Sequence, residues 1–156
     1  LEVRCKWPND LLVDGRKVGG ILAESAGGAG LDQFEPDQTA GAVAHVVIGS
    51  GINLVAPPEI EEAVGLGAGT DPTELLGGFL RRFREGYGSH GEHAASRSLD
   101  RWRAVADTLG RRVRAHRLDG EPIEGVARDV DEHGGLVVET LAGTMTVRFG
   151  EVEYLG

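Results

Sequence analysis

The sequence of 156 residues is long enough to bury a core, and its 40% hydrophobic content indicates a globular protein of one domain, with or without a small added module. Its formal net charge of −9 argues against binding along a nucleic-acid backbone, because the phosphates of that backbone favour basic surfaces. A single cysteine excludes an intramolecular disulfide and no apolar run is long enough to span a membrane, so we expect a cytoplasmic protein without a membrane partner.

The first third of the chain alternates β-forming segments with turns. Strands are predicted over residues 1–7, 11–13, 19–25 and 43–48. Between the second and third of them, Asp14-Gly15 is typical of a two-residue hairpin turn, since both positions favour positive φ. Residues 27–41 are rich in glycine and polar side chains and are expected to form a loop. The last strand is an apolar, β-branched run interrupted only by His45, which predicts a strand covered on both faces.

Two helices are predicted next. Asp71 is a suitable N-cap, because Pro72 follows it at the first helical position and Glu74 stands three residues later. Apolar residues then recur every three or four positions from Leu75 to Tyr87, and the helix is expected to end near residues 86–88. The second helix is predicted over about residues 93–109. Both helices are expected to pack on the same core.

From Gly110 onward, short alternating runs separated by tight turns replace the helical pattern. Strands are predicted over residues 113–117, 123–130, 136–140 and 144–149. Fewer than fifty residues with this layout favour a small closed or half-closed antiparallel barrel, which leaves few exposed edges. We therefore predict an α+β protein, with a mixed, mostly antiparallel sheet and packing helices over residues 1–109 and a small β-barrel over residues 110–156.

The segments around the predicted hairpin carry side chains suited to an anionic ligand. Lys17 follows the turn and precedes Gly19-Gly20, where missing side chains let a ligand approach the backbone. Asp10 belongs to the sequence KWPND at residues 6–10, which interrupts two strands and brings a carboxylate near Lys17. Lys6 of the same motif is a candidate phosphate contact.

Each of these residues also has a purely structural interpretation. Lys17 would then be a solvated turn residue, and Asp10 would hydrogen-bond the local backbone together with Asn9. Lys6 would be a strand residue whose charged tip lies in water. Trp7 is expected to pack in the core under either interpretation.

The sequence GSGIN at residues 49–53 follows the predicted strand at residues 43–48. It lacks the third glycine of a dinucleotide fingerprint, since residue 54 is leucine, and a Rossmann loop is therefore not expected. Gly51 would let a nucleotide lie against the backbone, and the amide of Asn53, which both donates and accepts, is suited to an adenine edge. The alternative is an asparagine that completes a turn.

The sequence predicts neither a metal site nor a cysteine nucleophile. Histidines stand at positions 45, 90, 93, 116 and 133, without the converging spacing of a zinc site. Cys5 lies beside Trp7 on a β-forming segment, where a buried and inert thiol is expected.

Three motifs together resemble, in the same order, those of the bacterial biotin–[acetyl-CoA-carboxylase] ligases. They are KWPND at residues 6–10, RKVGGIL at residues 16–22 and GSGIN at residues 49–53. The sequence RFGEV at residues 148–152 is similar to the close of that family's small C-terminal barrel, which is of the Src-homology-3 type. The resemblance covers the whole chain and implies part of a catalytic domain like that of class II aminoacyl-tRNA synthetases, followed by the barrel.

The resemblance also implies an activity and roles for individual residues. Members of the family use ATP and Mg²⁺ to convert biotin to biotinyl-5′-adenylate, and transfer biotin to a lysine of the biotin carboxyl carrier protein, an acetyl-CoA carboxylase subunit. Lys17 matches the lysine that binds biotin and the reacting groups, and Asn53 matches the adenine contact, with Gly51 and Lys6 as further ATP contacts. The strand lining the biotin pocket matches Gly19, Gly20, Ile21 and Leu22. Asp10 matches an acid that orients Lys17, helps to hold magnesium or faces the carrier lysine.

Two features of the family have no counterpart in this sequence. They are a glycine- and arginine-rich loop before the tryptophan–proline motif and an arginine shortly after Gly150-Glu151. We therefore expect the sequence to be the C-terminal portion of a longer enzyme. A homodimer of that enzyme is compatible with the sequence. A lipoate or octanoate ligase or transferase is the alternative enzyme. An inactive remnant that binds only nucleotide or carrier is the alternative from another class.

Overall fold

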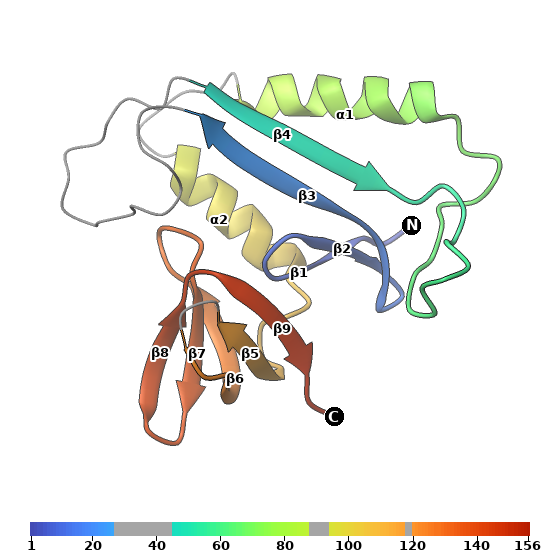
Figure 1. Ribbon diagram of the computed structural model, residues 1–156. Helices are drawn as coiled ribbons and strands as arrows, with labels where there is room; N and C mark the ends of the chain where they lie inside the picture. Colours follow the sequence, from blue (N-terminus) through green and yellow to red (C-terminus); the bar gives the residue numbers. More distant parts are fainter. Residues whose placement is uncertain (27–44, 88–93, 118–119) are drawn as a thin grey trace.

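The computed structural model describes residues 1–26, 45–87, 94–117 and 120–156, which form two antiparallel sheets and two helices (Figure 1). The predicted loop over residues 27–41, the histidines at positions 90 and 93, and Asp119 of a predicted turn lie outside these residues. Within the described part of the chain, no helix has the length and apolar character needed to cross a membrane.

The first sheet contains the strands of the N-terminal third. Its strands are β1 (Arg4–Lys6), β2 (Asp10–Val13), β3 (Arg16–Ala26) and β4 (His45–Ile52), in that order and paired antiparallel. The turn between β2 and β3 has the predicted form, with φ of 51° at Asp14 and 73° at Gly15. From Leu22 onward β3 pairs only with β4, so these two strands extend beyond the rest of the sheet as a long ribbon (Figure 1).

The prediction for β4 was wrong in two respects. Val46, Val47 and Ile48 are 53%, 58% and 41% exposed, so the strand is not covered on both faces. The strand also continues to Ile52, four residues beyond the predicted end, so that Gly49 and Gly51 belong to it. A run of β-branched residues favours a strand because branching at Cβ restricts χ1, but the run does not show whether other elements cover both faces. The strand predicted over residues 1–7 is likewise shorter, because only Arg4–Lys6 pairs with β2.

The first helix, α1 (Pro72–Tyr87), begins as predicted but does not pack as predicted. The Asp71 carboxylate accepts hydrogen bonds from the backbone N–H groups of Thr73 at 2.7 Å and Glu74 at 3.4 Å, which confirms the N-cap. None of the residues of α1 is buried. The expectation that its apolar stripe packs on the common core is therefore wrong, and the rings of Phe79, Phe83 and Tyr87 instead stack on one another.

The second helix, α2 (Ala94–Val105), packs Leu99 and Trp102 against the core. It ends four residues earlier than predicted, because the following residues join the first sheet. Ala106 forms a parallel bridge with Cys5, and the backbone N–H of Asp107 donates to the carbonyl oxygen of Cys5 at 2.7 Å.

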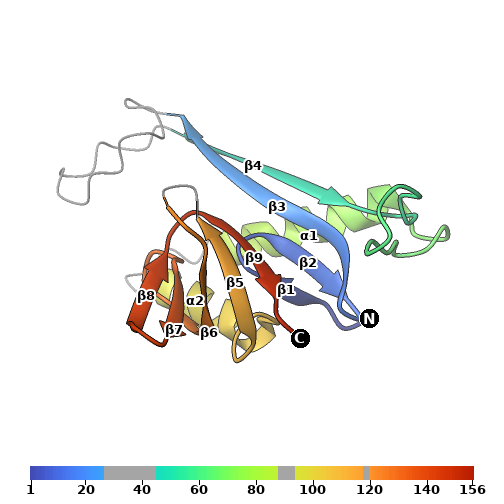
Figure 2. The ribbon, with the colours of Figure 1, turned by 60° about the horizontal axis from the view of Figure 1, so that its bottom comes forward.

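The second sheet contains five strands that curve into a half-closed barrel (Figure 2). They are β5 (Arg112–Arg117), β6 (Ile123–Val130), β7 (Leu136–Thr140), β8 (Gly143–Val147) and β9 (Gly150–Tyr154), in the order β8-β7-β6-β5-β9. The bounds of β6 and β7 are those predicted. The sequence did not predict β9, which starts at Gly150 with φ of 143°, where a Cβ atom would overlap the carbonyl oxygen of His116.

The main core lies in the barrel, and one residue from the turn between β1 and β2 belongs to it. Its buried side chains are Trp7, Val113, Ala115, Ala127, Val130, Leu136, Val138, Val147 and Val152. The backbone N–H of Trp7 donates to Oγ1 of the fully buried Thr108 at 2.9 Å, and its indole Nε1 donates to the carbonyl oxygen of Gly134 at 2.9 Å. Trp7 therefore anchors the segment between β1 and β2 in the barrel.

Candidate active site

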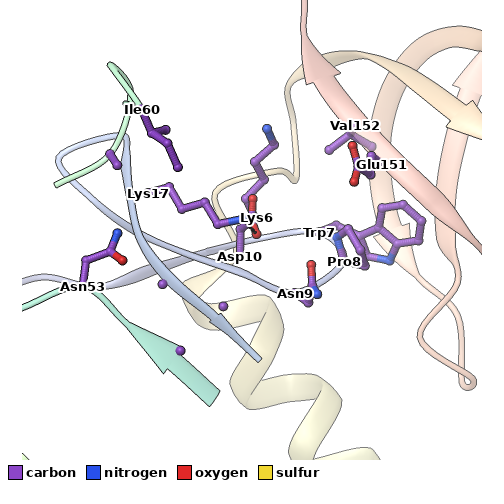
Figure 3. Close-up of a pocket in the computed structure, with 14 residues that line it drawn as sticks. Lys6, Trp7, Pro8, Asn9, Asp10, Lys17, Asn53, Ile60, Glu151 and Val152 are labelled. Atoms are coloured by element: carbon purple, nitrogen blue, oxygen red, sulfur yellow. Dashed lines mark ion pairs between the residues drawn. The ribbon is translucent and has the colours of Figure 1, made fainter. Parts of the chain in front are cut away.

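A cleft of about 510 Å³ lies where the first sheet, the loop after β4 and strand β9 meet (Figure 3). This volume is in the range of pockets that bind small molecules. The residues that line the cleft are Lys6, Trp7, Pro8, Asn9, Asp10, Lys17, Gly19, Gly20, Gly51, Asn53, Ile60, Ala63, Glu151 and Val152. Seven of the nine site residues expected from the sequence are among them, and the exceptions are Ile21 and Leu22.

Lys17 and Asp10 form an ion pair in the cleft, with Nζ and Oδ1 2.5 Å apart (Figure 3). The pairing of β2 with β3 shifts between Leu11 and Leu12, so that Lys17 stands opposite Leu12 and Gly20 stands opposite Asp10. In a regular strand, residues three positions apart face opposite sides, and this bulge therefore brings Lys17 and Gly20 to the same face. The sequence predicted the proximity of the two charges but not the bulge that produces it.

Lys6 lies in the same cleft without a carboxylate partner among the residues that the structure describes. Its Nζ stands 5.0 Å from the centre of the Tyr154 ring, within the range of a cation–π interaction. Lys6 and Lys17 are the two lysines of the sequence, whereas the other basic side chains, histidines aside, are arginines. Both compact ammonium groups are thus gathered in one cleft, where they are suited to neutralise an anionic ligand.

The glycines of the site serve different purposes. A Cβ atom on Gly19 would overlap the carbonyl oxygen of Gly51 in the paired strand, so the close approach of two strands requires this glycine. A Cβ atom on Gly51 would meet no heavy atom within 4 Å. Gly51 therefore leaves a free backbone surface in the cleft, which is the kind of surface that a flat ligand group can contact.

Asn53 lies at the end of the cleft away from Trp7 (Figure 3). Its backbone is fixed from two sides, because its N–H donates to Val18 O at 2.7 Å and its carbonyl oxygen accepts from Leu66 N at 2.9 Å. Within the described ranges no hydrogen bond involves its side-chain amide. The amide is therefore available to a ligand, as the binding interpretation of this residue requires.

Ile21 and Leu22 are the two expected site residues outside the cleft. Side chains alternate between the faces of a strand, so Leu22 shares the face of Gly20 but lies farther along the ribbon, where it is 56% exposed. Ile21 points to the opposite face. There it lines an apolar groove of about 280 Å³ between the ribbon and α1, with side chains that include Ile52 and Phe79.

The sequence did not predict the contributions of β9 and of the loop after β4. Glu151 and Val152 come from the barrel, and the only signal for them was the family's glycine–glutamate pair. Ile60 and Ala63 come from a loop held against β3, where Lys17 N donates to Glu62 O at 3.0 Å and Val64 N donates to Lys17 O at 2.9 Å. This loop carries no motif in the sequence.

Two further features of the described residues concern the Cys5 thiol and clusters of metal ligands. Burial raises the pKa of the Cys5 thiol, so that it stays protonated at neutral pH, and Cys5 does not line the cleft. No group of three or more histidine, cysteine, aspartate or glutamate side chains that could hold a metal ion occurs within the part of the chain that is described.

Comparison with protein families gives two matches along the chain. Residues 1–35 match the model described as the biotin/lipoate A/B protein ligase family, and residues 108–154 match the biotin protein ligase C-terminal domain. The two matched segments together contain Asp10, Lys17 and Glu151, which the structure places in one cleft.

Curated proteins and solved structures show the same likeness. The chain is 31% identical over 159 residues to the biotin–[acetyl-CoA-carboxylase] ligase of Mycobacterium tuberculosis, covering 99% of this chain and 54% of that protein. It is 33% identical over 171 residues to the ligase of the same description from Paracoccus denitrificans, covering 97% and 62%. The chain thus spans little more than half of the length of these relatives. The structure of a biotin protein ligase from Aquifex aeolicus in complex with biotin and ATP has the same fold, with a TM-score of 0.71, 24% identity and coverage of 99% and 62%.

Proposed function

Since this chain belongs to the biotin protein ligase family, we propose that it supplies one wall of the active site of an ATP-dependent ligase. The enzyme would activate biotin to biotinyl-5′-adenylate and transfer biotin to a lysine of the biotin carboxyl carrier protein. The relatives' description as biotin–[acetyl-CoA-carboxylase] ligases supports this protein substrate. The reaction would take place in the cytoplasm, where ATP and the acceptor are present.

The observation that carries the proposal is the position of both lysines in one cleft, with Lys17 held by Asp10. Adenylate formation brings the carboxylate of biotin against the α-phosphate of ATP. Two anions repel each other, so the protein's task is to position them and to neutralise their charge. The ammonium of Lys17 would contact the reacting carboxylate and phosphate, and Asp10 would hold that ammonium in place. Lys6 would contact the phosphates.

The remaining residues of the site would bind the two ends of the adenylate. Asn53 would hydrogen-bond the adenine, which would lie against the open backbone of Gly51. Biotin would lie along the β3 backbone from Gly19 to Leu22, on the face that Gly20 and Leu22 share. Ile21 would support this strand from the opposite face, where it borders α1.

Magnesium ions fit the donor groups of the cleft. Mg²⁺ in nucleotide sites is commonly bound by one or two carboxylates together with phosphate oxygens. Asp10 and Glu151 supply carboxylates on two sides of the cleft. When bound, the ion would neutralise charge on the phosphates of ATP, and these two residues would help to hold it.

The test is the Lys17→Ala variant of the full-length enzyme, assayed for ATP–pyrophosphate exchange dependent on biotin. We expect a large loss of exchange with little change in thermal unfolding, because the Lys17 side chain is 49% exposed and contributes little packing. Glu59→Ala, at an exposed position that does not line the cleft, is the control and should retain the wild-type rate. Unchanged exchange in Lys17→Ala would refute the assignment.

The choice of acceptor needs a separate measurement. Labelled biotin and labelled lipoate should be offered to the wild-type enzyme with the carrier domain of acetyl-CoA carboxylase and with a lipoyl domain. We expect label only from biotin and only in the biotin carrier. Lipoylation without biotinylation would instead establish the lipoate ligase interpretation, and binding without any transfer would establish a non-catalytic protein.

A further inference from the structure

Tyr154, the last residue of β9, has two cations near its ring. The Lys6 ammonium stands 5.0 Å from the centre of its ring, and the Arg111 guanidinium carbon stands 4.6 Å from it. Both distances are within the range in which the negative face of an aromatic ring attracts a cation. Of these two cations, Lys6 lines the cleft and Arg111 does not.

The barrel fixes the ring of Tyr154 independently of Lys6. Tyr154 stands opposite Val113 in the pairing of β5 with β9, and the ring packs against the barrel core. Its hydroxyl lies 3.2 Å from Oγ1 of Thr108, the group that also accepts the backbone N–H of Trp7. Strand pairing and core packing thus fix the ring, and its hydroxyl meets the same buried residue that anchors the segment following Lys6.

Arg111 is held by bonds of its own. Its guanidinium pairs with the Asp107 carboxylate at 3.0 Å and donates to the Asp107 carbonyl oxygen at 2.8 Å. Lys6, in contrast, forms no ion pair with the residues that the structure describes. Among the described ranges, its ammonium group contacts the Tyr154 ring alone.

From this arrangement we propose that Tyr154 is a positioning residue, whose ring holds the ammonium of Lys6 at the cleft for the phosphates of a nucleoside triphosphate. This inference rests on the proposed function, since it assumes that the cleft binds ATP. A carboxylate partner would also hold the ammonium but would offset its charge, as Asp10 does at Lys17. An aromatic face restrains the side chain while leaving its full positive charge for the ligand.

The experiment combines kinetics of the full-length enzyme with nuclear magnetic resonance of its lysine side chains. Tyr154→Leu removes the aromatic face, and Tyr154→Phe, the matched control, keeps it. We expect Tyr154→Leu to raise KM for ATP roughly 3- to 30-fold while KM for biotin stays near that of the wild type. Tyr154→Phe should retain the wild-type KM for ATP. In the Lys6→Gln background, Tyr154→Leu should add no further increase, because the contact is already absent.

The resonance measurement needs no folded variant of Tyr154. The ε-methylene protons of Lys6, identified by their loss in Lys6→Arg, should be shifted upfield by the ring in the wild-type protein and should move again when ATP and Mg²⁺ are added. Absence of the upfield shift would overturn the proposal, and so would an unchanged KM for ATP in Tyr154→Leu. The Lys6 signal could be shifted upfield while neither the Lys6 nor the Lys17 signal changes on addition of ATP. That result would refute the proposed function but not the contact between Lys6 and Tyr154.

Discussion

The indole Nε1 of Trp7 donates a hydrogen bond of 2.9 Å to the carbonyl oxygen of Gly134, a residue 127 positions away in the sequence. Trp7 belongs to the motif that borders the cleft, whereas Gly134 belongs to the turn between β6 and β7. The tryptophan side chain is 4% exposed and is surrounded by the barrel core. The shape of the cleft therefore depends on how the N-terminal segment is seated in the C-terminal sheet.

Trp7→Phe should destabilise the protein by about 1–3 kcal/mol, because the carbonyl oxygen of Gly134 loses its donor in a partly buried position. Trp7→Ala should cost about 3–5 kcal/mol, because it also empties the space of a buried aromatic ring. Urea unfolding followed by circular dichroism measures both values. Trp102→Phe, at a partly buried position, is the control and should cost less than Trp7→Ala. Equal losses for Trp7→Ala and Trp102→Phe would contradict the anchoring role.

Gly51→Ala should leave the stability within about 0.5 kcal/mol of the wild type, because its methyl group enters open space. The same methyl group should weaken binding of the adenylate by about 1–3 kcal/mol, because it occupies the surface assigned to the ligand. Isothermal titration with a non-hydrolysable biotinyl-adenylate analogue measures the affinity.

Gly19→Ala provides the contrast to Gly51→Ala, because its methyl group would overlap the backbone of β4 and should destabilise the fold by about 1–3 kcal/mol. Gly69→Ala, at an exposed position with no heavy atom within 4 Å of the added carbon, should change neither stability nor affinity. If Gly51→Ala bound the analogue as tightly as Gly69→Ala, the ligand would not lie against Gly51.

Asp71→Ala should destabilise α1 by about 1 kcal/mol, since the backbone N–H groups of Thr73 and Glu74 lose their acceptor. Asp71→Asn retains a side-chain oxygen and should lie close to the wild type. Because α1 has no buried residue, we expect the loss to appear as local opening. Amide hydrogen exchange of the first turn of α1 measures it. Equal protection in the alanine and asparagine variants would contradict the capping role.

Tyr154 should ionise at a higher pH than an ordinary tyrosine. Burial raises the pKa of Tyr154 to about 12, and the charge of Asp107 acts in the same direction, against the Thr108 hydrogen bond and the charge of Arg111. In the part of the chain that the structure describes, Asp107, Arg111 and Lys6 are charged groups near this side chain. The folded state keeps the proton that the unfolded chain releases near pH 10, so this contribution to stability is complete below pH 10 and is lost between about pH 10 and 12.

Ultraviolet absorbance of tyrosinate during an alkaline titration measures this shift. The wild type, which has two tyrosines, should show an additional late step that Tyr154→Phe lacks. Denaturant unfolding at pH 10 and at pH 12 should show a smaller loss of stability in Tyr154→Phe than in the wild type. A late step that persists in Tyr154→Phe would assign it to another residue.

Local patterns predicted the parts of the fold that local interactions determine. Asp14-Gly15 formed the expected turn, Asp71 capped the expected helix, and β6 and β7 had the expected bounds, because each depends on neighbouring residues. Most of the site residues expected from the motifs also lie together in the cleft. The prediction that the chain divides into two domains near Gly110 remains a prediction.

The parts that the sequence did not predict depend on contacts between distant residues. The bulge opposite Leu11 and Leu12 depends on the pairing of two strands, and the contribution of Glu151 to the cleft depends on how the barrel meets the first sheet. The exposure of α1 and β4 has a different cause. An apolar periodic pattern shows which face of an element is hydrophobic, but not whether another element covers it.

The seating of Trp7 in the barrel has a consequence for recombination between related ligases. A chimera joined at Gly110 would place the Trp7 side chain of one parent against the barrel side chains of the other. The sequence around Gly110 gives no sign of this contact. Exchange of the C-terminal segment should therefore succeed only when position 7 and the barrel side chains around it come from the same parent. Substitutions at position 7 and at these barrel positions should therefore covary among relatives, although the positions are far apart in the sequence.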